Sequence, residues 1–488
     1  MTKSTQNKSY ALPIAMMFAL FFMIAFVTGL PSPMGVIVAK QFNASNFASQ
    51  LGFFANFIAY AFMGIPAGIM LEKYGYKVTA LAAILVGITG VSVQFFSGVV
   101  GSFTVYLTGA FISGFSMCML NTVVNPMLNT LGGSGNKGNQ LIQFGGSINS
   151  IAATITPMLV GVLMGAEAGR TIEKANPALF LAIGIFALAF VVLYFVDIPE
   201  PHMITKAKSL IKDKYSPLSF RHFIFGAIAI FIYVGVEIGI PSTANLFMTA
   251  FTEKQAQEKI AEYNKQQTDV AYYNTLLEAD KVNKETKNYE TKVVGKDTFA
   301  KAEKIIAGKI RPGLGISAGV AGVLVGLYWL LMLVGRLLGA ALGAIFSSKA
   351  MMKFVSILGC ILILLAIFVP TSITINVTSI VRSSSPTTIP INIGFLILCG
   401  LCTSVMWGGI FNLAVEGLGK YTAAASGIFM VMVCGGGIVP LIQGYVADNA
   451  GYLASYWVMF ICVAYMLFYA LIGSKNVNKD IPVEISVV

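Results

Sequence analysis

The chain has 488 residues, of which 56% are hydrophobic and 11% are charged, and its mean hydropathy is +0.79. Soluble globular proteins carry about 25% charged residues, so this composition excludes an ordinary soluble protein. The formal net charge of +11 does not indicate a nucleic-acid-binding protein, because the basic residues lie in segments that flank apolar runs rather than on a polar domain.

Apolar runs long enough to cross a bilayer, about 20 residues each, recur along the whole sequence. We therefore predict an all-α integral membrane protein with twelve membrane-spanning helices, because a helix satisfies its own backbone hydrogen bonds in lipid. The predicted spans are residues 11–38, 47–71, 77–98, 101–131, 140–165, 177–197, 221–250, 313–346, 349–370, 389–416, 423–446 and 452–473.

Lysine and arginine are distributed unevenly between the two sides of these spans. With the N-terminus inside, the short outer segments carry only Lys40, Arg170, Lys174 and Arg382. The other short segments are rich in lysine, including the N-terminal residues and the segment between the sixth and seventh spans. This asymmetry follows the positive-inside rule and predicts a multi-pass inner-membrane protein whose two termini are cytoplasmic.

A polar, lysine-rich segment, residues 198–220, separates the first six spans from the last six. We expect it to be a cytoplasmic linker between an N-terminal half, residues 1–197, and a C-terminal half, residues 221–473, with a cytoplasmic tail at 474–488. The C-terminal half contains an extracytoplasmic insertion, residues 252–312, whose Lys, Glu, Gln and Ala content is typical of a solvated helix.

The two halves share short motifs that occur in the same order. Two parallel, similar six-span halves are the plan of a major facilitator transporter, with its solute site near the midplane between them. The matching pairs are Gly29–Ser32 with Gly239–Ser242, Gly64–Gly68 with Gly335–Gly339, Asn125–Gly132 with Asn412–Gly419, and Pro157–Gly161 with Pro440–Gly444.

One carboxylate, Glu237, lies near the middle of the span 221–250. A charge at the centre of a bilayer-spanning helix costs roughly 2.5–3.5 kcal/mol on insertion scales, so it usually marks a solute or ion path. Tyr233, Glu237 and Pro241 are four residues apart and share one helix face, and Pro241 weakens the backbone ladder beside the acid. We predict that Tyr233 and Glu237 line a polar cavity; the alternative is a structural Glu bonded to a neighbouring helix.

Three amides, Asn121, Asn125 and Asn129, follow one another at four-residue spacing in the span 101–131. An amide both donates and accepts hydrogen bonds, which suits sugar hydroxyls, although the same groups could instead join helices. The next span adds Gln143 and Asn149. We predict that Asn121, Asn125, Gln143 and Asn149 bind solute.

The span 389–416 supplies two further candidates. Trp407 could stack on the apolar face of a sugar ring, although aromatic residues in membrane helices more often pack or anchor the helix. Asn412 is the counterpart of Asn125 in the repeated motif.

Three charged residues are better explained by gating or structure than by solute binding. Arg336 and Glu416 lie toward the inner ends of their spans, and Glu72 lies in the turn between the second and third spans. We expect Arg336 to hold a carbonyl or carboxylate at one gate, and Glu72 to be a charged latch at the inner mouth.

The chain lacks the sequence signs of metal, redox or enzyme chemistry. All six cysteines lie within apolar runs, and the two histidines flank the central linker. No acid–base pair or nucleophile motif occurs within the spans. We expect no cofactor, no metal and no enzymatic activity.

Several motifs resemble the fucose–proton symporter and glucose/galactose transporter family of the major facilitators. The likeness covers most of the chain except the insertion, and it is most specific in spans ten and eleven. The motifs are Asn121–Pro126, Met406–Thr422 and Gly435–Asp448, together with Tyr233–Glu237, Gly335-Arg336 and Pro66–Lys77. The resemblance implies a transporter of neutral sugars.

This sequence departs from the fucose symporters at the two acids that the family uses. Their first-span Asp corresponds to the region Gly29–Gly35, which has no acid, and the Glu before their fourth-span motif corresponds to Asn121. Asn cannot titrate, so that proton route is absent as written. Glu237 remains as the ion-coupling candidate: desolvation could let it carry a proton near neutral pH, or its oxygens could hold Na⁺.

The sequence therefore predicts a monomeric major facilitator that imports a neutral monosaccharide by alternating access, with H⁺ or Na⁺ as coupling ion. Its other partner is the lipid bilayer. Three alternatives remain: a uniporter, a transporter of another small solute such as a nucleoside or drug, and a non-transporting membrane sensor on the same fold.

Overall fold

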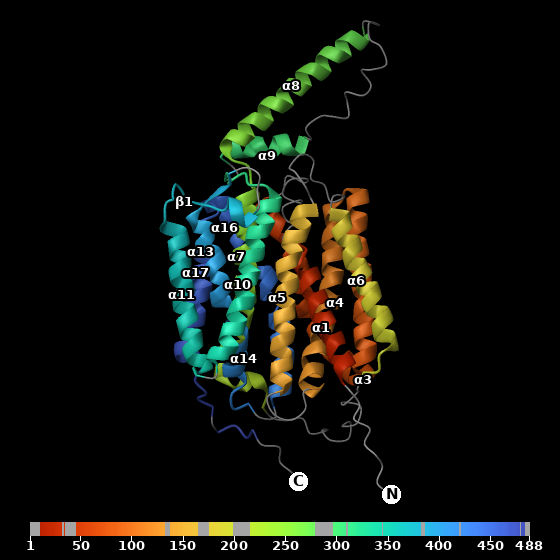
Figure 1. Ribbon diagram of the computed structural model, residues 1–488, viewed down its shortest axis with the longest axis vertical. Coiled ribbons are helices and arrows are strands. Elements are labelled where there is room, and N and C mark those ends of the chain that lie inside the picture. The colour runs from red at the N-terminus through yellow and green to blue at the C-terminus, as the bar shows by residue number, and fades with distance from the viewer. Residues whose placement is uncertain are drawn as a thin grey trace.

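The helices of the computed structural model run roughly parallel to one another in a single elongated bundle (Figure 1). The structure describes residues 10–31, 34, 45–131, 137–163, 175–198, 215–278, 296–308, 311–343, 345–381, 386–418, 421–478 and 480–483. The predicted linker therefore lies mostly outside the described residues, as do the centre of the insertion and the end of the tail.

The first part of the bundle contains the six predicted N-terminal spans. Its helices are α1 (Ala11–Gly29), α3 (Asn46–Val100), α4 (Phe103–Leu131), α5 (Lys137–Leu163) and α6 (Asn176–Phe195). Helix α3 holds two spans, Asn46–Leu71 and Lys73–Val100. They are separated at Gly75, where a φ of 82° turns the chain back. Glycine adopts this backbone conformation without the penalty that a Cβ would add.

The second part contains the remaining spans, three of them divided. Spans ten and eleven are each broken into two shorter helices, and span twelve ends in a π-helical segment. The elements are α7 (Arg221–Thr249), α10 (Ala318–Leu342), α11 (Ser348–Phe368), α13 (Ile391–Thr403), α14 (Met406–Val415), α15 (Thr422–Met432), α16 (Gly435–Ala450), α17 (Tyr456–Phe468) and η7 (Tyr469–Gly473), after a short 3-10 helix, η3 (Pro217–Ser219).

Eleven helices among the described residues are long and apolar enough to cross a membrane. Helix α5 completes the bundle; its apolar stretch is shorter, Phe144–Val160, because polar and glycine residues fill its first turns. The predicted all-α, twelve-helix fold is confirmed. Helix α1 begins and η7 ends at one end of the bundle, which we call the termini end (Figure 1).

The insertion lies at the opposite end of the bundle, which we call the insertion end (Figure 1). Its helix α8 (Glu253–Glu278) extends away from the bundle, and α9 (Lys296–Ile306) packs against the base of α8. A small apolar cluster of Ala256, Ala302 and Ile305 joins the two helices. The same end carries a short antiparallel pair, β1 (Thr374–Asn376) with β2 (Thr388–Pro390), with α12 (Thr378–Val381) between them.

Glycines bring α16 against α3 near the insertion end. A Cβ at Gly437 would lie 2.7 Å from Phe54 Cα, and a Cβ at Gly444 would lie 2.8 Å from Asn46 O. Only a residue without a side chain permits such a close backbone approach. The two parts of the bundle are therefore closely packed at this end.

The same interface separates toward the termini end. A Cβ at Gly64 would still lie 2.9 Å from Val431 Cγ2, whereas one at Gly68 or Gly427, a turn further on each helix, would meet no heavy atom within 4 Å. The close glycine contacts between α3 and the α15–α16 span thus extend from Asn46 to Gly64, well beyond the middle of the helices.

Candidate functional site

A cavity of about 230 Å³ lies in the middle of the bundle, between helices of its first and second parts. It is lined from α1, α3, α4 and α5 on one side and from α7, α10, α14 and α15 on the other. A single water molecule needs a cavity of at least about 10–15 Å³. The cavity is therefore large enough for a solute the size of a monosaccharide together with some water.

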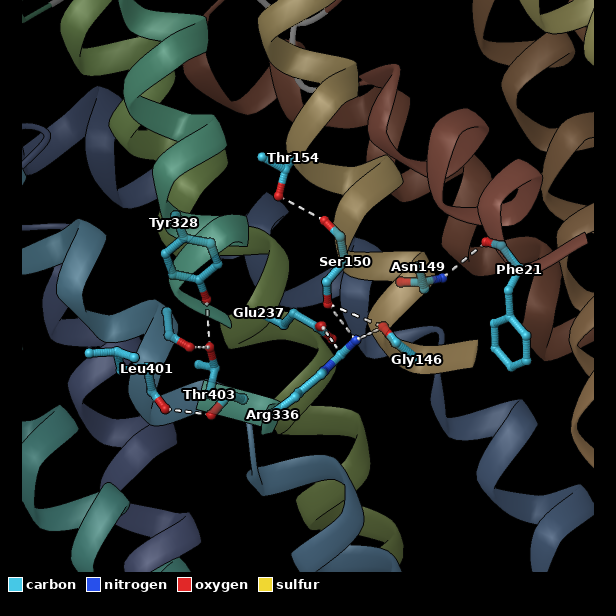
Figure 2. A network of polar contacts seen from close by, with 12 residues as sticks. Phe21, Gly146, Asn149, Ser150, Thr154, Glu237, Tyr328, Arg336, Leu401 and Thr403 are labelled. Carbon is cyan, nitrogen blue, oxygen red and sulfur yellow. Dashed lines mark hydrogen bonds and ion pairs between the residues drawn. The ribbon is translucent and has the colours of Figure 1, made fainter. Parts of the chain in front are cut away.

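The polar groups of the cavity include one acid and one base. Glu237 on α7 and Arg336 on α10 both line it, and their side chains point toward one another (Figure 2). Glu237 Oε1 lies 3.6 Å from Arg336 Nη2, and each side chain is 16% exposed. The prediction that Glu237 lies at a polar cavity agrees with this placement.

Pro241 also lines the cavity, one turn after Glu237. Proline has no N–H, so the Glu237 carbonyl loses its normal helical partner four residues later. Directly after Pro241 on α7, Ser242 Oγ and Thr243 Oγ1 accept hydrogen bonds from the buried side chain of Gln50 on α3, at 3.1 Å and 3.3 Å. The weakened part of α7 is thus held from the opposite part of the bundle.

Arg336 makes its hydrogen bonds across the cavity. Its Nη1 donates to Gly146 O and, at 2.7 Å, to Ser150 Oγ, both on α5 (Figure 2). The predicted carbonyl and carboxylate partners are thus present, at the mid-bundle cavity. Arg336 therefore joins two helices that are far apart in the sequence.

The predicted amide stripe is only partly brought into the cavity. Asn121 and Asn125 line it. Asn121 Nδ2 donates to Tyr60 Oη at 3.0 Å, and Asn125 Nδ2 donates to Asn121 O at 3.0 Å. Because Tyr60 accepts from Asn121, its hydroxyl proton can be directed to a solute in the cavity. The side chain of Asn129 lies outside the described residues.

Span five contributes Asn149, which lines the cavity and whose Nδ2 lies 3.5 Å from Phe21 O on α1 (Figure 2). The side chains of two other predicted residues, Gln143 and Glu72, are not among those that the structure describes.

Aromatic rings form much of the remaining cavity wall. Trp407 on α14 and Tyr233 on α7 both line the cavity, with ring centroids 6.0 Å apart at 56°. Trp329 lines it from α10, and Phe53 and Phe57 line it from α3. Flat apolar surfaces beside amides and hydroxyls are suited to a molecule that has both apolar faces and polar edges.

Two predicted residues lie away from this site. Asn412 is exposed and does not line the cavity. It follows Trp407 by five residues, which rotates it about 140° around the helix from the cavity-facing Trp407. Glu416 is also exposed; its backbone oxygen is 3.0 Å from His222 Nε2, so the interaction involves the main chain.

Some cavity residues were not predicted from the sequence. Thr28 on α1 and Ser242 on α7 line the cavity, as does Tyr60. Thr28 and Ser242 belong to or adjoin the repeated motif of spans one and seven, which is the signal that could have identified them. Tyr60 is a single tyrosine in an apolar helix and carries no such signal.

Two buried hydroxyls at the cavity, Thr28 Oγ1 and Tyr233 Oη, make no hydrogen bond of normal geometry within the described part of the chain, although Tyr233 faces Glu237 and Arg336. Buried polar atoms are normally satisfied, so these two are positioned to bind a solute or water. No group of three or more His, Cys, Asp or Glu residues that could hold a metal ion occurs among the described residues.

Comparison with known proteins identifies the fold. A sequence profile of the Major Facilitator Superfamily matches residues 16–256. The whole fold agrees with this match: a major facilitator transporter, FucP, solved in the outward conformation, superposes with a TM-score of 0.62 at 19% identity, covering 96% of this chain and 100% of that one. The chain has the major facilitator fold and is a multi-pass membrane protein.

Two relatives match nearly the whole chain. This chain is 25% identical over 479 residues to the glucose/galactose transporter of Brucella abortus biovar 1 (strain 9-941), with 97% of each chain covered. It is 21% identical over 503 residues to the L-fucose-proton symporter of Escherichia coli (strain K12), with 97% of this chain and 96% of the symporter covered.

Proposed function

We propose that this major facilitator is a secondary active transporter that imports a neutral monosaccharide, of the fucose, glucose or galactose kind, by alternating access. The observation that carries the proposal is the cavity itself, in which amides, hydroxyls and two tryptophans of the described residues surround the acid–base pair of Glu237 and Arg336. The names of the relatives support the sugar class, since they include a glucose/galactose transporter and a fucose symporter.

The charge of the cavity favours a neutral solute. Among the described residues that line it, Glu237 is the acid and Arg336 is the base, and the two lie within 3.6 Å of one another. Their opposite charges offset each other, so a charged solute would have to compete with this pair for a counter-charge in a poorly hydrated site. A sugar needs only hydrogen bonds and stacking, which Asn121, Asn125 and Trp407 can supply.

Glu237 is the proposed ion-coupling residue. It lines the cavity beside Arg336 and precedes the prolyl break by one turn, so a cation bound there would be close to the solute. The coupling cation is H⁺ or Na⁺. A carboxylate serves either, since it can be protonated or can ligate a hard cation with its oxygens.

The proposed placement in the membrane puts the termini end in the cytoplasm of a bacterial-type inner membrane and the insertion end outside. The uneven distribution of lysine and arginine supports this orientation. Residues 1–197 and 221–473 are the two moving halves, joined by the linker 198–220 and followed by the tail 474–488. The transporter functions as a monomer.

The test is counterflow in proteoliposomes with a panel of labelled hexoses, deoxyhexoses and nucleosides, using the wild type and Asn125→Ala. We expect exchange of at least one hexose or deoxyhexose and a severalfold weaker half-saturation in Asn125→Ala. Exchange of a nucleoside and of no sugar would contradict the monosaccharide proposal and support the alternative solute.

A further inference from the structure

Arg336 has more hydrogen-bond donors than the described residues accept from. A guanidinium carries five N–H donors in a fixed plane. Its two hydrogen bonds to described residues both leave from Nη1, toward Gly146 O and Ser150 Oγ on α5. The donors on Nη2 and Nε therefore remain for other partners, and Arg336 lines the cavity.

The contact between Arg336 and Glu237 is too long for a hydrogen bond. Arg336 Nη2 and Glu237 Oε1 are 3.6 Å apart, whereas charged N–H···O bonds are about 2.7–2.9 Å. At this distance an oxygen from water or a solute can bridge the two groups. A hydroxyl fits this place because its oxygen accepts from Arg336 while its proton is donated to Glu237.

The neighbouring tyrosine strengthens this interpretation. Tyr233 lies one turn before Glu237 on α7, is 0% exposed, and its hydroxyl faces Glu237 and Arg336 without a hydrogen bond of normal geometry to either. The same corner of the cavity thus combines a charged donor, a charged acceptor and a hydroxyl. Two adjacent oxygens of a polyol would satisfy all three groups.

We propose that Arg336 is a solute-binding and specificity-determining residue, and that Arg336 and Glu237 together bind one hydroxyl of the sugar. Ser150 is a positioning residue, since its hydroxyl and the Gly146 carbonyl fix the plane of the guanidinium. This inference rests on the proposed function. It also connects the solute to both parts of the bundle, because the guanidinium that binds it is held by α5 and belongs to α10.

The test measures equilibrium binding in detergent to the wild type, Arg336→Gln and Arg336→Lys. The ligands are the hexose that the wild type binds best and each of the monodeoxy derivatives of that hexose. We expect one deoxy position to weaken wild-type binding by about 10- to 100-fold, since hydrogen bonds to charged groups contribute about 1.5–3 kcal/mol. In Arg336→Gln the parent sugar binds more weakly, and that deoxy derivative is no longer disfavoured. Arg336→Lys should not restore the preference, because an ammonium lacks the planar fork.

Two variants on α5 distinguish a positioning role of Ser150 from a general disturbance of the fold. Ser150→Ala removes one bond that orients the guanidinium and should reduce the same deoxy preference without abolishing it. Thr154→Val is the matched control: Thr154 Oγ1 donates to Ser150 O and does not line the cavity. It should leave the preference unchanged. Melting curves with each protein show whether a variant is folded.

The outcomes separate the two proposals. If the wild type binds no monosaccharide, the proposed function fails and this inference fails with it. If the wild type binds a sugar but folded Arg336→Gln retains every deoxy preference of the wild type, the proposed function stands and the assignment of Arg336 is overturned.

Discussion

The carboxylate of Asp448 caps the first turn of α3 at Asn46. Asp448 Oδ1 accepts from Asn46 N at 2.7 Å, and Oδ2 accepts from Phe47 N at 2.9 Å. Tyr452 Oη also donates to Asn46 Oδ1 at 2.9 Å. A helix N-terminus has unpaired N–H groups and a positive end, so it binds an acid well. These contacts join the two parts of the bundle at the insertion end, next to the close α3–α16 packing.

Asp448→Ala should weaken closure at the insertion end. Two charge-assisted bonds are lost at a partly exposed site, so we expect the closed state to lose about 1–2 kcal/mol, or roughly a 5- to 30-fold change in the open-to-closed ratio. Double electron–electron resonance measures the distance between spin labels at the exposed positions Val100 and Thr374. The longer-distance population should increase in the variant.

Asn449→Ala is the matched control for this prediction. Asn449 is adjacent and exposed, and its side chain bonds to Tyr445 O on its own helix. It should leave the distance distribution unchanged. An unchanged distribution in Asp448→Ala would show that the cap does not hold the insertion end closed.

Glu237→Gln should separate solute exchange from ion coupling. The amide keeps the size and much of the hydrogen bonding of the carboxylate but cannot take up a proton or balance a cation. We expect counterflow to persist with a weaker half-saturation, because one charged hydrogen-bond partner of the sugar is lost, and no accumulation above equilibrium. Glu416→Gln, an exposed position away from the cavity, should accumulate sugar as the wild type does. Normal gradient-driven accumulation by Glu237→Gln would exclude Glu237 as the coupling residue.

Trp407→Ala should weaken sugar binding by about 5- to 50-fold, because stacking surface on the cavity wall is lost. Trp407→Phe should recover part of the affinity. The control is Trp457→Phe: Trp457 packs with Phe368 and Phe460 and does not line the cavity. Isothermal titration of each variant measures the change. Equal affinities in Trp407→Ala and Trp457→Phe would contradict the stacking role.

Gly435→Ala should destabilise the protein. A Cβ there would lie 1.9 Å from Phe231 O, so α7 and α16 would have to move apart. Overpacking of this kind costs about 1–3 kcal/mol or more. Gly184→Ala, where no heavy atom lies within 4 Å of the added Cβ, is the control. The melting temperature of Gly435→Ala in detergent should lie below those of the wild type and of Gly184→Ala. Equal melting temperatures would show that the helices can move apart at no cost in stability.

Sequence patterns are sufficient to predict features that depend on one helix alone, such as its membrane span and the residues that share one of its faces. The membrane spans follow from local composition, and Glu237 was identified because an acid in an apolar run is costly. The spacing of Asn121 and Asn125 placed both on one face, and both line the cavity.

Contacts between distant helices were not predictable in this way. The Arg336–Ser150 bond joins residues 186 positions apart, so no local pattern indicates it. Asn412 was selected by motif likeness to Asn125, but α14 begins at Met406 and turns Asn412 away from the face of Trp407. The role of a polar residue depended on helix rotation and packing, which the repeat alone does not determine.

The most direct test of the account is uptake of a labelled hexose into wild-type proteoliposomes under an imposed pH gradient, an imposed Na⁺ gradient, and no gradient. The account predicts accumulation above the equilibrium level under one of the two gradients, and equilibration alone without a gradient. Equilibration under all three conditions would contradict cation coupling, and the absence of any uptake across the hexose panel would contradict the proposed sugar transport itself.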